Sequence, residues 1–201
     1  AFGVVRKRGI YMQEAVPTGG AMTAVLGLDP EKIEEICKET AQKESAVVSI
    51  ANYNCPGQIV ITGQKDAVDK AAAACSEAGA KRTVPLKVSG PFHSKMLEGA
   101  GEKLGEALKD VEIHDIKVPY ITNVTADYVA SKDDVKDYLK RQVSSSVRWQ
   151  QTIERLIADG ADEFIEIGPG RSLAGFMRKI NRDVKVVNID KLEDFEKYVN
   201  R

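Results

Sequence analysis

The chain has 201 residues, 43% of them hydrophobic and 29% charged, a composition that is ordinary for a soluble globular protein. Its formal net charge of −1 provides no basic field for a phosphate backbone, so we expect no nucleic acid partner. No apolar run approaches the ~20 residues that span a bilayer and no signal peptide is recognisable, which predicts no membrane association.

The cysteines and histidines do not form the pattern of a metal site or of a disulfide framework. Cys37 and Cys75 fall on the apolar faces of two expected helices, which predicts buried thiols, whereas Cys55 stands in a turn and is open to exposure. With only His93 and His114 as imidazole ligands, we expect no zinc site. Free thiols fit a reducing compartment, so we expect a cytoplasmic protein.

The first expected element is an amphipathic helix over residues 3–16, entered almost at Ala1, which predicts that further sequence precedes it. Its stripe recurs at spacings of three and four and comprises Val4, Val5, Arg8, Met12 and Ala15. Arg8 falls in the middle of this apolar stripe, where a guanidinium costs free energy unless it is paired. Two interpretations stay open: the side chain snorkels or forms a salt bridge, or it is placed to meet a buried anion.

Residues 21–88 alternate strands and helices in the order βαββαβ. Strands are expected at 21–26, 46–51, 58–62 and 82–88. Asp29 and Pro30 suit the cap and the first position of one helix, and Gly79 suits the end of the other. The apolar faces of the two helices contain Ile33, Ile36, Cys37, Val68, Ala71, Ala72 and Cys75. This order predicts a split ferredoxin-like unit with both helices on one face of the sheet.

After the loop at 89–94 the pattern is that of a larger α/β body. Helices are expected around Leu97, Ala100, Leu104 and Leu108, and over 133–144, 149–159 and 172–180; strands are expected at 119–124, 163–167 and 184–189. The strand at 163–167 is of the buried type, and with the following helix and strand it predicts a parallel βαβ unit. The fold class expected is therefore α/β, with the βαββαβ unit inserted in the larger body.

One loop has the features of a catalytic segment. His93 lies between a strand and a helix in the stretch from Ser89 to Ser94, next to Gly90 and Pro91. A rigid scaffold can aim a loop histidine, and imidazole titrates near neutral pH, so His93 suits a general acid or base. His114 lies in an alternating segment and is expected at the surface.

A second stretch imitates a catalytic motif. Ser172 follows a strand and opens a helix, as the serine of a nucleophile elbow does. The elbow requires Gly-x-Ser-x-Gly, and here Gly175 comes one position late. We therefore expect Ser172 to be a residue of the first helical turn. The 201 residues contain no nucleophile elbow, P-loop or dinucleotide fingerprint.

Five stretches together resemble the malonyl-CoA:acyl carrier protein transacylase family of bacterial type II fatty acid synthesis. They occur in the family's order along the whole chain and are Arg6 to Gln13, Asn52 to Gln58, Gly90 to Ser94, Arg141 to Trp149, and Glu166 to Gly170. The resemblance implies a hydrolase-like large subdomain over 1–19 and 89–201 with a parallel sheet, and a ferredoxin-like small subdomain over 20–88. It also implies that the chain matches the C-terminal two thirds of the family and lacks its Gly-His-Ser-Leu-Gly elbow, so the chain alone is expected to be inactive.

The resemblance implies a ping-pong reaction in fatty acid biosynthesis. A serine takes malonyl from malonyl-CoA and passes it to the phosphopantetheine thiol of acyl carrier protein, with coenzyme A thioester as substrate and no cofactor or metal. His93 matches the general base, and Gln142 matches the residue whose backbone carbonyl fixes the histidine tautomer. Arg8 matches the residue that binds the malonyl carboxylate, and Met12, Phe92 and Asn54 are expected to contact substrate. A monomer is expected for the full-length enzyme.

Two other functions compete with this interpretation. A chain without its nucleophile is able to serve as a non-catalytic binding module. An acyltransferase of a polyketide pathway is the nearer enzymatic alternative.

Overall fold

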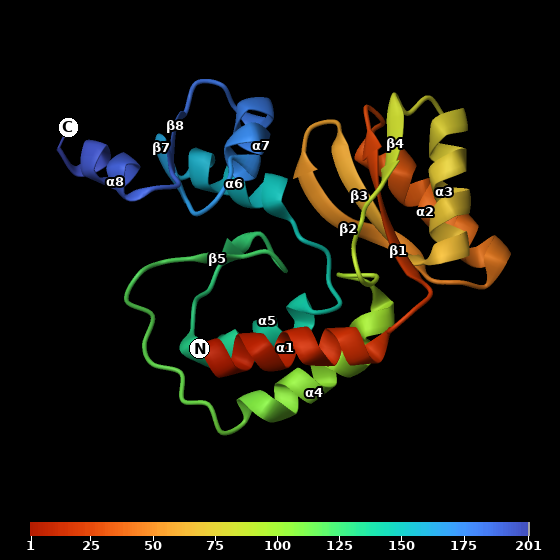
Figure 1. Cartoon of the computed structure of the whole chain (residues 1–201), viewed down its shortest axis with the longest axis horizontal. Helices are drawn as coiled ribbons and strands as arrows, with labels where there is room; N and C mark the ends of the chain where they lie inside the picture. The colour runs from red at the N-terminus through yellow and green to blue at the C-terminus, as the bar shows by residue number, and fades with distance from the viewer. Residues whose placement is uncertain (201) are drawn as a thin grey trace.

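A computed structural model describes residues 1–200 and shows an α/β fold. Four antiparallel strands form its largest sheet, in the order β2-β3-β1-β4. The strands are β1 (Gly20–Leu26), β2 (Val48–Cys55), β3 (Gln58–Gln64) and β4 (Arg82–Pro85). Helices α2 (Pro30–Glu44) and α3 (Lys65–Glu77) cover one face of this sheet, as Figure 1 shows.

The two faces of this sheet have different partners. Alternation along β1 directs Val25 into the core beneath α2 and α3, and Met22 and Ala24 to the opposite face. The helix-covered core contains thirteen buried residues, among them Ile33, Ile59, Ile61 and Val68. The opposite face lies toward the loop that carries Phe92, and it forms one wall of the site described below.

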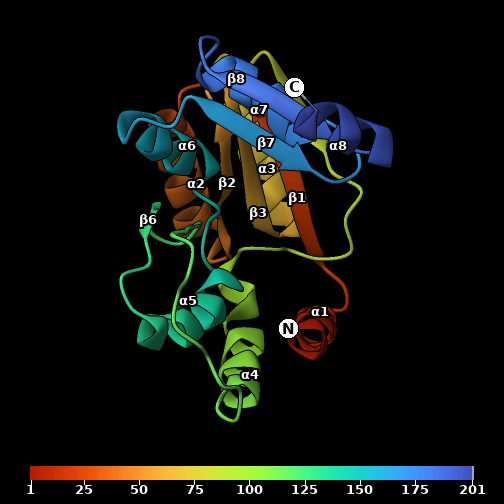
Figure 2. The same ribbon diagram turned by 90° about the vertical axis from the view of Figure 1, so that its left-hand side faces the viewer.

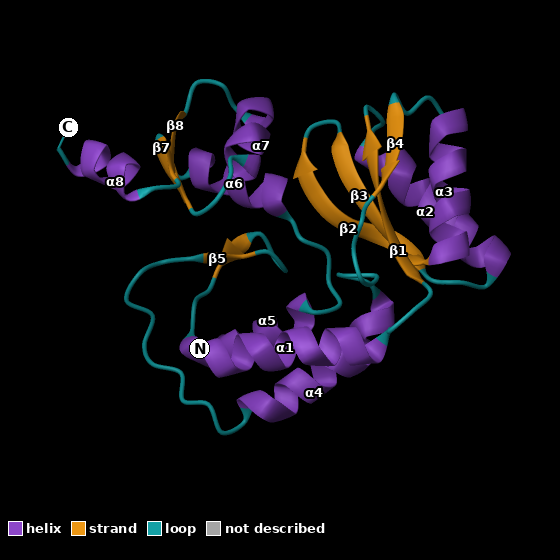
Figure 3. Ribbon diagram, in the orientation of Figure 1, coloured by secondary structure: helices purple, strands orange, loops and turns teal. Residues whose placement is uncertain are grey.

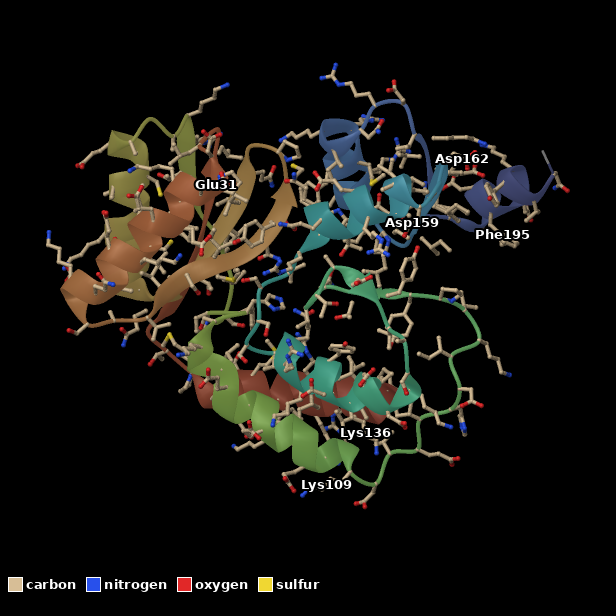
Figure 4. The ribbon with its side chains drawn as sticks, turned by 180° about the vertical axis from the view of Figure 1, so that it is seen from behind. Glu31, Lys109, Lys136, Asp159, Asp162 and Phe195 are labelled. Carbon is tan, nitrogen blue, oxygen red and sulfur yellow. The ribbon has the colours of Figure 1, made fainter. Side chains whose placement is uncertain are left out.

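Three helices form a second layer beside the sheet: α1 (Phe2–Ala15), α4 (Glu98–Leu108) and α5 (Val135–Gln142) (Figure 2). Their shared core is made of Met12, Val16, Leu97, Ala100, Leu104, Leu108 and Val143. Figure 4 labels two residues that join α4 to α5: the Lys136 ammonium donates to the backbone carbonyl of Lys109 at 2.9 Å.

The C-terminal part contains α6 (Trp149–Ala158), β7 (Glu163–Ile167), α7 (Ser172–Ile180), β8 (Lys185–Ile189) and α8 (Leu192–Val199). Strands β7 and β8 pair in parallel, as the βαβ pattern predicts. The Glu166 carboxylate accepts hydrogen bonds of 3.0 Å from the backbone N–H groups of Leu173 and Ala174, and so binds the N-terminus of α7. Helix α8 is not among the elements that the sequence patterns predict.

The expected strand at 119–124 is wrong in length. Only β5 (Ile121–Thr122) is a strand, and it forms an antiparallel hairpin with β6 (Asp127–Tyr128), at the end of a long loop seen in Figure 3. The strand at 163–167, whose composition is of the buried type, is partly uncovered, because Ile165 is 41% and Ile167 79% exposed. Within residues 1–200, β7 pairs with β8 alone, which leaves part of its surface uncovered.

All three cysteines are buried free thiols. This confirms the prediction for Cys37 and Cys75, whereas Cys55, left open to exposure, is fully buried at the end of β2 where α7 packs. Among residues 1–200, no helix combines the length and the apolar character needed to cross a membrane.

Candidate active site

The loop that carries His93 is held rigidly on both sides. Pro91 is fully buried against Gly20, so closely that a Cβ on Gly20 would lie 2.2 Å from the Pro91 ring. After the histidine, the buried Ser94 hydroxyl accepts from the Met96 N–H at 3.2 Å and caps the short helix η1 (Lys95–Leu97). His93 itself has φ +60, a left-handed conformation that costs about 1–3 kcal/mol. The surrounding packing therefore holds the histidine in a strained position.

The ring of His93 has a defined tautomer. Its Nδ1 lies 3.1 Å from the Gln142 backbone oxygen and 3.2 Å from the Ser145 backbone oxygen. Because a carbonyl oxygen only accepts, Nδ1 must carry the proton and donate it to these two oxygens. Nε2 then has a free lone pair, which is the state that a general base requires.

The two carbonyls are fixed by attachment of residues 144–148 to the edge of β2. The Val147 N–H donates to the Ala51 carbonyl at 2.7 Å, and the Val147 carbonyl accepts from the Tyr53 N–H at 2.9 Å. The Ser146 hydroxyl donates to the Ile50 carbonyl at 2.6 Å. The Gln142 side-chain amide also donates to the Ser145 carbonyl, at 3.2 Å. Orientation of His93 thus depends on contacts between segments far apart in the sequence.

A cavity of about 560 Å³ lies beside His93, between α1 and the open face of the large sheet. We call it the Arg8 cavity; its lining is Arg8, Gly9, Met12, Gln13, Met22, Asn52, Leu86, Val88, Ser89, Phe92 and His93. Four residues singled out from the sequence, Arg8, Met12, Phe92 and His93, are thus brought together from α1 and the loop after β4. Phe92 packs against both the helical core and the open sheet face.

Asn54 does not line the cavity, and Asn52 does. In a regular strand the two would share a face, because side chains alternate with a period of two. Register shifts interrupt the β2–β3 pairing between Ile50 and Asn52 and again between Tyr53 and Cys55. A bulge leaves no clear mark in composition or periodicity, so the sequence offered no means of choosing between the two asparagines.

Burial and charge act on the ionisable groups of the cavity. Arg8 is half-buried, and desolvation lowers its pKa from the ordinary arginine value. The pKa of His93 is also lowered, mainly by burial; the Gln142 carbonyl opposes this, the positive charge of Arg8 adds to it, and the Ser145 carbonyl opposes it. No carboxylate lines the cavity, so within the described residues Arg8 faces it without an anionic partner.

Two other sequence candidates lie elsewhere. His114 has a side chain 80% exposed, as expected for a surface residue. Ser172 is the first residue of α7 and is exposed, which agrees with a place in the first helical turn.

A second hollow of about 540 Å³ meets the Arg8 cavity at His93. We call it the cationic hollow; its lining is Ala41, Ala46, Val47, Val48, Ser49, His93, Lys95, Val124, Arg141, Ser144, Ser145, Ser146 and Arg148. His93 is the residue that both linings share.

Known proteins resemble this chain in sequence and in structure. Malonyl CoA-acyl carrier protein transacylase of Bacillus subtilis is 47% identical over 193 residues, which are 96% of this chain and 61% of the relative. The Staphylococcus aureus (strain COL) protein of the same name is 45% identical over 195 residues, 96% of this chain and 63% of the relative. The chain therefore spans somewhat less than two thirds of the length of these relatives.

Solved structures agree with the sequence matches. An acyl carrier protein S-malonyltransferase from Vibrio cholerae has a TM-score of 0.94 at 40% identity, over 98% of this chain and 64% of that chain. PlMCAT, a malonyl-transacylase solved in complex with the type II PKS acyl-carrier protein AntF, has a TM-score of 0.93 at 40% identity, with the same coverage. The family model of the acyl transferase domain matches residues 1–190. The chain that places Arg8 and His93 around one cavity belongs to the acyl transferase domain family.

Proposed function

We propose that the protein transfers a malonyl group from malonyl-CoA to the phosphopantetheine thiol of acyl carrier protein, in fatty acid biosynthesis. One observation carries the proposal. A half-buried arginine, without a carboxylate partner in the described part of the chain, shares a cavity with a histidine whose Nε2 is free to accept a proton. A guanidinium is suited to a planar carboxylate, and the base is suited to acyl transfer at the other end of the same short substrate.

The chemistry proceeds in two matched halves. His93 Nε2 takes the hydroxyl proton as a serine oxygen attacks the thioester carbonyl; the carbon–sulfur bond breaks, and the same proton passes to the departing coenzyme A sulfur. The carrier protein's thiol then attacks the serine ester, and His93 moves a proton from that thiol back to the serine oxygen. The serine is proposed to belong to a nucleophile elbow, a motif that these 201 residues do not contain. The reaction as proposed uses no cofactor.

Arg8 is proposed to make two parallel hydrogen bonds to the malonyl carboxylate. An acyl group without that carboxylate leaves the half-buried charge unpaired, so discrimination arises from the penalty as well as from the attraction. Met12 and Phe92 are proposed as apolar walls of the acyl site. We propose Asn52, rather than Asn54, as the polar residue that faces the thioester arm.

We also propose a division into two subdomains. Residues 20–88 would form the ferredoxin-like small subdomain, and 1–19 with 89–201 the hydrolase-like large one. The cavity lining draws on both parts, with Met22, Asn52 and Leu86 from the first and Arg8 and His93 from the second. Such a cleft between subdomains is a usual place for a substrate site.

A basic surface on α7 and β8 favours an acceptor that is acidic or that carries a phosphate. Among residues 1–200, a hollow of about 780 Å³ along α7 and β8 is lined by four cations and no carboxylate; the cations are Arg171, Arg178, Lys179 and Arg182. Charge of one sign steers an oppositely charged partner to its site. Because PlMCAT was solved with a polyketide carrier protein, a polyketide acyl carrier protein is the second candidate acceptor.

The test joins this chain to the part of the Bacillus subtilis relative that it does not span. Transfer of labelled malonyl from malonyl-CoA to holo-acyl carrier protein is measured for the joined protein and for its His93→Ala and His114→Ala variants. The proposal predicts transfer that His93→Ala reduces by at least about 100-fold and His114→Ala leaves unchanged. Equal activity of the two variants would exclude His93 as the base.

A further inference from the structure

Among the residues that the structure describes, every charged neighbour of His93 that lines its two cavities is a cation. Arg8 of α1 lines one side, and Lys95, Arg141 and Arg148 line the other. Arg141 forms an ion pair with Asp137 at 3.2 Å. Within residues 1–200, Arg8, Lys95 and Arg148 have no carboxylate at salt-bridge distance, and neither lining contains an aspartate or glutamate.

Arg8 is the cation whose charge acts on His93 most clearly. Its positive charge disfavours the imidazolium and adds to the effect of burial in lowering the pKa of His93. The two carbonyls that accept from Nδ1 act in the opposite direction and stabilise the protonated ring. In the free protein, His93 therefore has the orientation that a general base needs, but Arg8 lowers its affinity for a proton.

A carboxylate bound to Arg8 reverses the electrostatic part of this balance. It adds one negative charge to a cavity that otherwise contains a single positive one, so the net field at the imidazole falls toward zero. Because Arg8 is half-buried, salt screens its interaction with His93 less than it screens a pair of surface charges. The effect of the bound carboxylate should therefore persist at physiological ionic strength.

Resting on the function proposed above, we propose that the substrate's own carboxylate activates the general base, by neutralising the guanidinium of Arg8, which lines the same cavity as His93. Arg8 is then a specificity residue in two ways. It binds malonyl, and it leaves His93 a weaker base when the acyl group has no carboxylate. A stronger base removes the serine proton more readily, so part of the preference for malonyl appears in the chemical step and not in binding alone.

The coupling must be reciprocal. If a carboxylate in the Arg8 cavity raises the proton affinity of His93, then protonation of His93 must tighten carboxylate binding by the same factor. We expect the dissociation constant of a malonyl ligand to fall by about threefold or more when His93 becomes protonated, whereas that of an acetyl ligand changes little or rises.

The chain is well suited to a direct test because it contains only two histidines. Proton NMR titration of the imidazole signals follows His93, with the exposed His114 as an internal reference. The 201-residue chain is titrated free and then saturated with amide analogues of malonyl-pantetheine or acetyl-pantetheine, in which nitrogen replaces the thioester sulfur and blocks transfer. The variant Arg8→Gln is titrated without ligand, and Arg6→Gln, at an exposed position of the same helix, is its matched control.

We expect three results for the midpoint of the His93 titration. It moves to higher pH with the malonyl analogue and does not rise with the acetyl analogue. In the absence of ligand, it is already higher in Arg8→Gln than in Arg6→Gln. If the titration midpoint of His93 in ligand-free Arg8→Gln equals that in Arg6→Gln, the inference is overturned. Binding of the malonyl analogue with no movement of His93 overturns it while leaving the proposed function intact. Failure of the malonyl analogue to bind better than the acetyl analogue contradicts the proposed function, and the inference with it.

Discussion

Replacing Arg8 by alanine should change the choice of substrate more than the ability to transfer an acyl group. The side chain is half-buried, faces a cavity that no carboxylate of residues 1–200 lines, and is proposed to bind the malonyl carboxylate. Each hydrogen bond to a charged group contributes about 1.5–3 kcal/mol, so loss of the two proposed bonds should lower kcat/KM for malonyl-CoA by at least the equivalent of one bond, about 10- to 150-fold. Acetyl transfer should stay unchanged or improve, because the variant removes an unpaired cation from the path of an apolar acyl group.

The assay compares both donors in the protein completed with the remainder of the Bacillus subtilis relative. Arg6→Ala, on the exposed side of α1, is the control for effects on the helix itself. Arg8→Lys should not restore malonyl transfer, because an ammonium lacks the planar two-point geometry of a guanidinium. If Arg8→Ala lowers malonyl and acetyl turnover by the same factor, the carboxylate role is refuted.

Three further outcomes are expected. Phe92→Ser should reduce discrimination between malonyl-CoA and methylmalonyl-CoA by about 1–3 kcal/mol at most, since one methyl group contributes no more in an apolar pocket. An unchanged ratio of the two products in competition assays would refute a steric role. Thermal unfolding of this variant should show some destabilisation, because Phe92 packs against two cores. The 201-residue chain incubated with labelled malonyl-CoA should retain no covalent label after denaturation, and an acid-stable label on Ser172 would show that the nucleophile assignment is mistaken. Because Ile165 and Ile167 are uncovered, limited proteolysis should cut the chain first in and around β7. Glu166→Ala should lower the free energy of unfolding by about 1–3 kcal/mol in chemical denaturation, because two backbone N–H groups at the start of α7 lose their acceptor, and a change below a few tenths would contradict the capping role.

Local periodicity is enough to predict the elements that carry their own signals. Helices α2 and α3 have an apolar residue at every third or fourth position, and Gly79 ends α3 with a φ of +99 that glycine adopts without strain. The parallel pairing of β7 with β8 follows from a strand, helix and strand in close succession. The anomalous place of Arg8 on an apolar stripe follows from the same helical periodicity.

What the sequence did not reveal depends on contacts between distant segments. A strand at 119–124 needs a neighbour to pair with, and only Ile121 and Thr122 find one. Cys55 is buried because α7, more than a hundred residues later, packs on β2. The displacement of Asn54 from the cavity arises from register shifts, which depend on the β2–β3 pairing. The left-handed backbone of His93 is imposed by its neighbours and is not encoded in its own preference.

A crystal structure with the amide analogue of malonyl-pantetheine tests the central claim most directly. The account predicts the carboxylate at hydrogen-bonding distance from the Arg8 guanidinium, and the acyl carbonyl on the side of His93 that Nε2 faces. A ligand whose carboxylate instead lies in the cationic hollow, against Lys95 or Arg148, would contradict the assignment of the acyl site.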